Sequence, residues 1–306
     1  MSVLHIQLFG GIHLTNRDNK AIPLQPTVQI FLAYLLLNRH RYHCREVLSG
    51  LFWGEREENQ ARRCLSTTLW RLRQELEPEG TPRGTFVVTT NSGEIGFNCQ
   101  VEDVWLDVAA FEEKVGKGLS CTPAEMGTAE AQLLEEAAKL YTGDLLEGFY
   151  ADWVLQHRER LRGQYIKCLG RLMRYHSGQG SYEQGIYYGR KILDIDPLRE
   201  EVHREVMRLL DQNGERPQAI RQYESCRQIL AQELEIQPML ETQTLYKQLF
   251  TANGQLAVPP LNKAGEEQPE NLQQALRQLD QALLNLEEVR GQLNHARQLF
   301  THFLNR

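Results

Sequence analysis

Long apolar runs and paired cysteines are missing from this chain of 306 residues. The longest apolar run, Phe31–Leu37, is far shorter than the roughly 20 residues that cross a bilayer, so we expect no membrane partner. The N-terminus has no basic stretch followed by an apolar one, and no signal peptide is expected. The six cysteines stand singly, without a CxxC pair, which is typical of reduced thiols. These features predict a cytoplasmic protein.

Motifs for catalysis and nucleotide binding are also missing. The sequence contains no HExxH, no GxSxG and no GxxxxGK[ST] pattern. We therefore expect no catalytic residues, no metal site and no cofactor, and we do not expect an enzyme.

An excess of positive charge is absent as well, since the formal net charge is −6. Residues 1–105 hold equal numbers of basic and acidic side chains, so the rest of the chain carries the whole deficit. A neutral domain can still bind DNA when its cations gather on one face.

The N-terminal part has the pattern of a winged helix-turn-helix. Apolar and polar residues alternate over residues 3–24, which predicts short strands, and apolar spacing predicts helices over 28–37, 44–55 and 60–76. Residues 84–98 read as a β-hairpin that turns at Asn91–Gly93. Strands, three helices and a hairpin in this order predict a DNA-binding domain over residues 1–105.

The third predicted helix, QARRCLSTTLWRLRQEL, carries four arginines. At about 100° per residue its packed face consists of Ala61, Leu65, Thr68, Leu69, Leu72 and Leu76. The opposite face is predicted to contact base edges in the major groove through Arg62, Arg63, Ser66, Thr67, Trp70 and Gln74. Phosphate contacts are predicted for Arg71, Arg73 and the hairpin residues Thr89, Thr90 and Asn91. Because the hairpin tip has no Lys or Arg, hydroxyl and backbone groups would make its contacts.

The chain beyond residue 105 is predicted to be helical up to about residue 250. Gly180, Gln184 and Gly185 recur 34 positions later as Gly214, Gln218 and Ala219, which is the tetratricopeptide period. Tyr150 and Trp153 are expected as core aromatics between repeats, the alternative being a ligand groove that they line.

The last part of the chain divides in two by composition. Residues 251–271 are rich in Pro, Gly and Glu and predict a flexible linker. Residues 272–306 carry a leucine stripe that predicts an amphipathic helix, which either pairs in a coiled coil or lies on the protein's own surface. The fold class is therefore mainly α: an N-terminal winged helix-turn-helix (α+β), an all-α tetratricopeptide-like domain over 106–250, and a C-terminal amphipathic helix.

Several stretches resemble the Streptomyces antibiotic regulatory protein (SARP) family, in which an OmpR-type winged helix precedes a bacterial transcriptional activator domain. The segments LFWGE, ARRCLSTTLWRLRQEL, TTNSGEIGF and LDVAAFE occur in the family's order. In the second domain, LYTGDLLEGFYADWVLQHRERL and AIRQYESCRQILAQELEIQP match its helical signatures. The resemblance covers about Leu4 to Phe250 and leaves out the segment after Pro259.

The resemblance implies a function. It carries recognition-helix roles onto Arg62, Ser66, Thr67, Trp70, Arg71 and Arg73. It also implies an activator that binds direct repeats in double-stranded DNA as adjacent protomers and contacts RNA polymerase. Self-association as a homo-oligomer fits the repeats and the leucine stripe. Two alternatives remain: a protein-interaction scaffold whose winged helix binds DNA weakly or without sequence preference, and a sensor whose repeats bind a small molecule.

Overall fold

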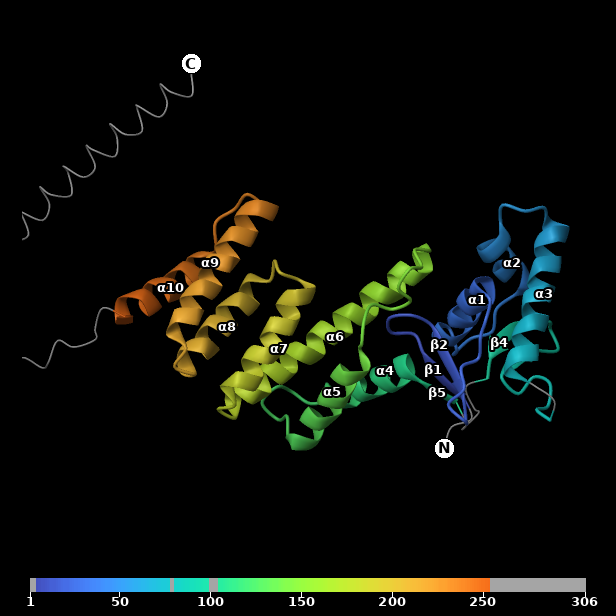
Figure 1. Ribbon diagram of the computed structural model, residues 1–306, viewed down its shortest axis with the longest axis horizontal. Coiled ribbons are helices and arrows are strands. Elements are labelled where there is room, and N and C mark those ends of the chain that lie inside the picture. The colour runs from blue at the N-terminus through green and yellow to red at the C-terminus, as the bar shows by residue number, and fades with distance from the viewer. Residues whose placement is uncertain (1–3, 78–79, 99–103, 254–306) are drawn as a thin grey trace, which may run out of the picture. The chain divides into compact units, whose positions relative to one another are not determined.

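A computed structural model describes residues 4–77, 80–98 and 104–253 of the protein. The N-terminal part contains the strands, helices and hairpin that the sequence predicts, in the predicted order (Figure 1). They are β1 (Leu4–Gln7), β2 (His13–Asn16), α1 (Pro26–Leu37), α2 (Arg45–Trp53), α3 (Glu58–Leu76), β3 (Val87–Thr89) and β4 (Ile95–Phe97).

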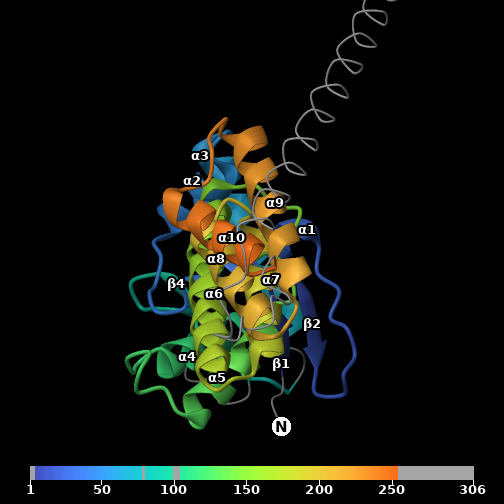
Figure 2. The same cartoon turned by 90° about the vertical axis from the view of Figure 1, so that its left-hand side faces the viewer.

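β1 lies at the centre of a three-stranded sheet. It pairs antiparallel with β2, Leu4 opposite Asn16, and the two strands run side by side (Figure 2). On its other side it pairs parallel with β5 (Val104–Leu106), Leu4 opposite Val104. Leu4 and Ile6 are buried while His5 and Gln7 are exposed, which is the period of a strand with one buried face. The sequence does not predict β5, because three residues are too few to show a period.

α1 forms the centre of the N-terminal core. The whole run Phe31–Leu37 is buried, which explains why it has no polar side. The ring of Phe31 lies 5.3 Å from that of Phe52 and 6.4 Å from that of Trp53, both on α2. α3 packs against α1 and α2, so its position relative to the rest of the domain is set by buried apolar contacts.

The remainder of the described chain is helical, as predicted. Its helices are α4 (Asp107–Gly118), α5 (Thr128–Leu140), α6 (Asp152–Gly178), α7 (Tyr182–Ile195), α8 (Glu200–Gln212), α9 (Arg216–Glu233) and α10 (Leu240–Asn253). They pack as the antiparallel pairs α4–α5, α6–α7 and α8–α9, with α10 against α8 and α9. Short connections between paired helices are typical of tetratricopeptide-like repeats.

The 34-residue repeat has a structural basis. Gly180 and Gly214 occupy equivalent turns, after α6 and after α8, with φ of +72° and +80° that favour glycine. Gly185 and Ala219 are both buried at helix contacts, and a Cβ on Gly185 would lie 2.9 Å from a methyl of Leu209. Small side chains at these positions therefore allow the helices to approach closely.

Contacts between the N-terminal domain and the repeats are extensive. The Oδ2 of buried Asp107, at the start of α4, accepts hydrogen bonds from the backbone N–H groups of Leu8 (2.7 Å) and Phe9 (2.9 Å). Burial raises the pKa of Asp107, against the effect of these donors. Buried apolar residues from Leu4 to Leu249 form one continuous cluster, and the described residues up to Asn253 belong to one compact unit.

A charged group at the same junction joins α4, α6 and the turn that follows α1. Glu112 on α4 accepts from Arg39 at 2.8 Å and from Arg160 on α6 at 2.6 Å. Burial pushes the pKa of Glu112 upward, but hydrogen bonds from the two guanidinium groups outweigh it and hold the pKa below its usual value. The carboxylate therefore stays ionised and paired at neutral pH.

The two aromatic residues expected between repeats lie elsewhere. Trp153 packs against the N-terminal domain, its ring 5.1 Å from Tyr34 and 6.4 Å from Phe52. The expectation for Tyr150 is wrong, since its side chain is 75% exposed. Tyr150 lies in the segment just before α6, which begins at Asp152.

The predicted C-terminal segments lie almost wholly outside the described residues. Only the first three positions of the predicted linker are described, and they continue α10 to Asn253. The first strong helix breaker within the predicted linker is Gly254, so the sequence of residues 251–253 does not end the helix. The rest of the linker and the predicted helix over 272–306 cannot be compared with the structure.

Candidate nucleic-acid interface

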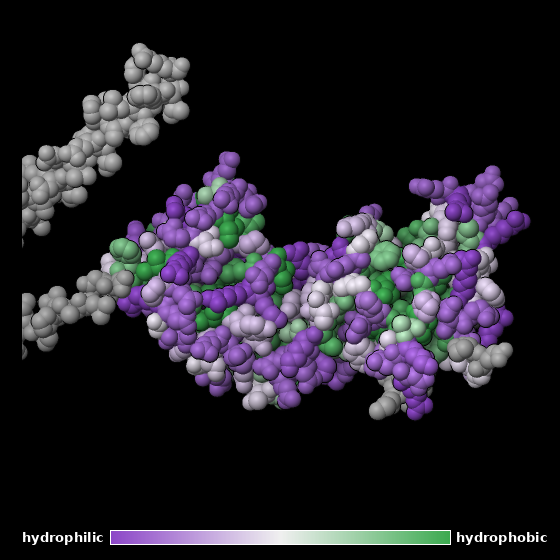
Figure 3. All heavy atoms as spheres, viewed as in Figure 1, coloured by the Kyte–Doolittle hydropathy of each residue, from purple (hydrophilic) through white to green (hydrophobic). Residues whose placement is uncertain are grey.

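α3 has the two faces that its sequence predicts. Its buried residues are Ala61, Leu65, Thr68, Leu69, Leu72 and Leu76, the whole predicted packed face. The helix lies at the edge of the domain beside the hairpin (Figure 1), and hydrophilic residues cover this part of the surface in Figure 3. The opposite face of α3 is therefore open to a ligand.

Seven of the eight α3 residues predicted to contact DNA are exposed: Arg62, Arg63, Ser66, Thr67, Trp70, Arg71 and Gln74. Trp70 is 60% exposed, which is unusual for so large an apolar ring. Its exposure between polar neighbours means that burial in the fold does not account for this tryptophan, so a ligand that covers the ring would gain apolar contact.

The polar groups on this face have only weak internal partners. Arg62 pairs with Glu58 at 2.6 Å, but both side chains are more than half exposed, so the pair adds little stability. The hydroxyls of Ser66 and Thr67 each donate to the carbonyl four residues earlier at 2.9 Å. Oγ of Ser66 also accepts from Arg45, and each hydroxyl retains an acceptor lone pair. The guanidinium of Arg63 has no hydrogen-bond or ion-pair partner among the described residues, and its side chain is exposed.

Arg71 lies where α3 faces the start of α1. Its Nη1 donates to Oε1 of Gln25 at 2.6 Å, and its side chain is exposed. Gln25 is neutral, so the positive charge of Arg71 remains uncompensated and available to an anion.

Arg73 differs from the other arginines of α3. Its side chain is half-buried, and its Nη2 donates to the backbone carbonyl of Val87 at 2.9 Å and to Oγ1 of Thr89 at 2.8 Å. Burial lowers the pKa of Arg73, and the nearby carboxylate of Glu77 raises it by a smaller amount. The sequence predicts a phosphate contact here, but these hydrogen bonds direct the guanidinium toward β3.

The wing, residues Val87–Phe97, forms as predicted. β3 and β4 pair antiparallel with Val87 opposite Phe97, and the turn closes through a bond from the N–H of Gly93 to the carbonyl of Thr90 at 2.9 Å. Gly93 has φ of +84°, which explains a glycine at this position.

The predicted contact residues of the wing differ in availability. Thr89 accepts from Arg73, and Oγ1 of Thr90 accepts from the N–H of Glu94 at 3.1 Å. Asn91 is exposed at the tip. The wing also carries the carboxylate of Glu94, which accepts from Ser92 at 2.9 Å. A contact with phosphate from this side therefore depends on Asn91 and on backbone N–H groups.

Arg45 belongs to the same face, although the sequence does not indicate it. It is the first residue of α2, and its Nη2 donates to Oγ of Ser66 on α3 at 3.0 Å. Its place beside α3 depends on how α2 crosses that helix. A basic residue at the start of the supporting helix is the only local signal.

The part of the chain that the structure describes holds neither a membrane-spanning helix nor a metal-binding cluster. No helix in the described ranges has the length and apolar character needed to cross a membrane. Within those same ranges, no group of three or more His, Cys, Asp or Glu residues is placed to hold a metal ion.

Comparison with known proteins identifies relatives. Residues 106–250 match the family described as the bacterial transcriptional activator domain. Two curated proteins called regulatory protein AfsR are similar to the chain: that of Streptomyces coelicolor, 26% identical over 242 residues, and that of Streptomyces griseus, 24% identical over 234 residues. The alignments cover 79% and 76% of this chain but only 24% and 23% of the relatives, so the chain spans about a quarter of their length.

A solved structure has the same fold over most of the chain. It is Mycobacterium tuberculosis EmbR in complex with a low-affinity phosphopeptide, 18% identical, with a TM-score of 0.68. The match covers 82% of this chain and 66% of the EmbR chain.

Proposed function

We propose, from the match of residues 106–250 to the bacterial transcriptional activator domain and the similarity to the AfsR regulatory proteins, that the chain is a transcriptional regulator of the SARP type that binds specific sequences in double-stranded DNA. The observation that carries the proposal is the exposed face of α3. It combines exposed guanidinium groups, two hydroxyls, an amide and a tryptophan on a helix that the core supports from behind.

Each side chain on α3 has a role that follows from its chemistry. Arg62, Arg63 and Gln74 present donors to base edges in the major groove, and Ser66 and Thr67 accept or donate there. Trp70 contacts a thymine methyl or a sugar. Arg71 binds phosphate, and Asn91 does so from the wing.

Arg45 and Arg73 complete the interface in different ways. Arg45 contributes a second phosphate contact beside Ser66. Arg73 holds the wing against α3 through Val87 and Thr89, so we assign it a positioning role in place of a phosphate contact.

We further propose that the protein is an activator. Two protomers would bind adjacent direct repeats near a promoter and contact RNA polymerase, as the resemblance to the SARP family implies. A template that carries the bound repeat upstream of a weak promoter tests this step in a purified transcription reaction. A rise in transcript on addition of the chain supports activation, and a fall means repression.

DNA recognition is tested by selecting bound sequences from a random duplex pool at about 50 and 200 mM salt. The expected result is one enriched motif, recurring as a direct repeat, at both salt concentrations. The double variant Arg63→Ala, Gln74→Ala should lose the motif. The control variant Arg221→Ala, which removes an exposed arginine on α9, should keep it.

Binding that is blind to sequence and lost at the higher salt would contradict the proposal. The α3 face would then be a general cationic patch, and the function would lie with the helical repeats as a protein-interaction scaffold.

A further inference from the structure

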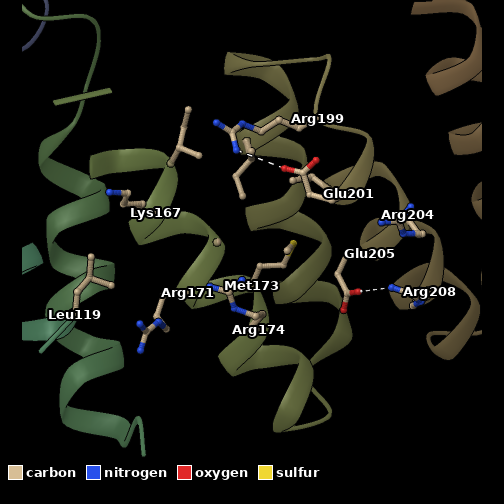
Figure 4. Close-up of a pocket in the computed structure, with 14 residues that line it drawn as sticks. Leu119, Lys167, Arg171, Met173, Arg174, Arg199, Glu201, Arg204, Glu205 and Arg208 are labelled. Atoms are coloured by element: carbon tan, nitrogen blue, oxygen red, sulfur yellow. Dashed lines mark hydrogen bonds and ion pairs between the residues drawn. The ribbon is translucent and has the colours of Figure 1, made fainter. Parts of the chain in front are cut away.

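A groove of about 550 Å³ lies in the helical repeats, apart from α3 (Figure 4). One face of α6 and one face of α8 line the groove, and Leu119, which follows α4, lies at one side of it. Its volume is within the range of about 300–1,000 Å³ typical of ligand-binding clefts.

The groove combines apolar and cationic side chains. Its apolar lining comes from Leu119, Ile166, Met173, Ile192 and Val202. Six cations also line it, against two carboxylates, Glu201 and Glu205. The cations are Lys167, Arg171, Arg174, Arg199, Arg204 and Arg208. This excess of positive charge stands out in a chain whose net charge is −6.

Three of these cations have side-chain partners within the protein. Arg199 pairs with Asp196 at 2.9 Å and with Glu201 at 3.5 Å, and Arg208 pairs with Glu205 at 3.0 Å. Arg204 donates to Oγ1 of Thr242 at 3.0 Å. The two carboxylates in the lining are therefore already paired.

The other three cations, Lys167, Arg171 and Arg174, form no ion pair with any residue that the structure describes. They stand on α6 at spacings of four and three, so they lie in one row along the helix, about 10 Å from first to last. Figure 4 shows Lys167, Arg171 and Arg174 along this helix beside the groove.

Arg171 is the most buried of the row. Its Nη1 donates to the carbonyl of Cys121 at 2.8 Å, which fixes the guanidinium at the groove, while its Nε is buried and has no acceptor among the described residues. A half-buried cation without a carboxylate is costly unless an anion comes from outside.

We propose that this groove binds an acidic peptide segment of a partner protein. Carboxylates of the peptide pair with Lys167, Arg171 and Arg174, and an apolar side chain beside them packs on the partly exposed lining residues Leu119 and Ile166. The apolar lining favours a peptide over nucleic acid, because the charged phosphates of a nucleic-acid backbone gain nothing from it. The site is independent of DNA binding through α3.

A phage-displayed library of random peptides of about twelve residues, selected on the full chain, tests the proposal. The expected pool is rich in Asp and Glu interspersed with Leu, Ile, Met or Phe. An enriched peptide, made synthetically with a fluorescent label, should bind roughly tenfold more weakly to Arg174→Glu, because the charge reversal repels its carboxylates. The matched control Arg221→Glu, an exposed arginine on α9 outside the groove, should bind as the unmodified chain does.

The results that overturn the proposal are equally specific. A pool that is neutral or basic, or peptides that bind Arg174→Glu as tightly as the unmodified chain, would exclude an acidic-peptide groove. Displacement of the peptide by random duplex DNA from the unmodified chain would assign the groove to nucleic acid instead. Circular dichroism of Arg174→Glu, together with its unchanged selection of duplex DNA, shows that the variant is folded and separates this test from that of DNA recognition.

Discussion

Replacing Arg73 by lysine should destabilise the wing while the charge of α3 stays the same. The guanidinium binds β3 through Nη2 to the Val87 carbonyl (2.9 Å) and to Oγ1 of Thr89 (2.8 Å), and Nε is 3.3 Å from the same carbonyl. An ammonium group lacks the planar arrangement of donors that makes these bonds together. Hydrogen bonds from charged groups contribute about 1.5–3 kcal/mol, and we expect a loss of that size in the free energy of unfolding.

Two measurements on the full chain check this expectation. Urea unfolding gives the loss of stability. Binding to the selected DNA and to a scrambled duplex, over a range of salt, should show a similar loss of affinity on both sequences and an unchanged salt slope. The control is Arg71→Gln, which should leave stability unchanged and reduce the salt slope by about one, because it removes a phosphate contact.

The reasoning fails if lysine at position 73 preserves both stability and affinity while Arg73→Gln reduces the salt slope by about one. That outcome would make Arg73 a phosphate contact, as the sequence alone predicts, and would remove its role in holding the wing.

Three more predictions concern specificity, packing and pH. Arg63→Ala should relax base choice at one position, at a cost of about 1–3 kcal/mol against the preferred base; an equal loss on every sequence in a binding assay would contradict it. Gly189→Ala should cost about 1–3 kcal/mol in urea unfolding, because its Cβ would lie 2.4 Å from a methyl of Val206. Gly163→Ala, with no atom within 4 Å, is the control and should not destabilise. Burial lowers the pKa of His203 in the folded chain. Below about pH 6.5 the imidazole is therefore protonated in the unfolded chain but stays neutral in the folded chain, and Tm should fall from pH 7.5 to 5.5. His203→Gln should lower Tm but flatten this decline, and an equally steep decline in the variant would refute the assignment.

Local periodicity was sufficient to predict α3. A rotation of about 100° per residue separates the six buried positions of α3 from its exposed face, and the structure buries those six. The turn at Gly93 and the paired glycines of the repeats, Gly180 and Gly214, follow from backbone conformations that other residues adopt with strain.

Contacts between distant parts of the chain were not predictable in this way. The sequence places Arg73 on a helix but does not show which groups its side chain contacts. The position of β3 beside the helix shows that the guanidinium donates to Val87. Arg45 contacts Ser66 because of the angle at which two helices cross. The aromatic character of Trp153 predicts burial but does not identify Tyr34 as its partner. The DNA-binding roles themselves stay predictions.

If the chain binds DNA as proposed, the hydrogen bonds of Asp107 and Glu112 and the ring contacts of Trp153 with the N-terminal domain have a consequence for promoter architecture. A partner protein bound to the helical repeats would therefore have a fixed orientation relative to the axis of the bound DNA. B-DNA completes a turn in about 10.5 base pairs, so half a turn inserted between operator and promoter would carry that partner to the opposite side, and a full turn would bring it back. Regulation would then oscillate with spacing, whereas a domain on a flexible tether would show a smooth decline.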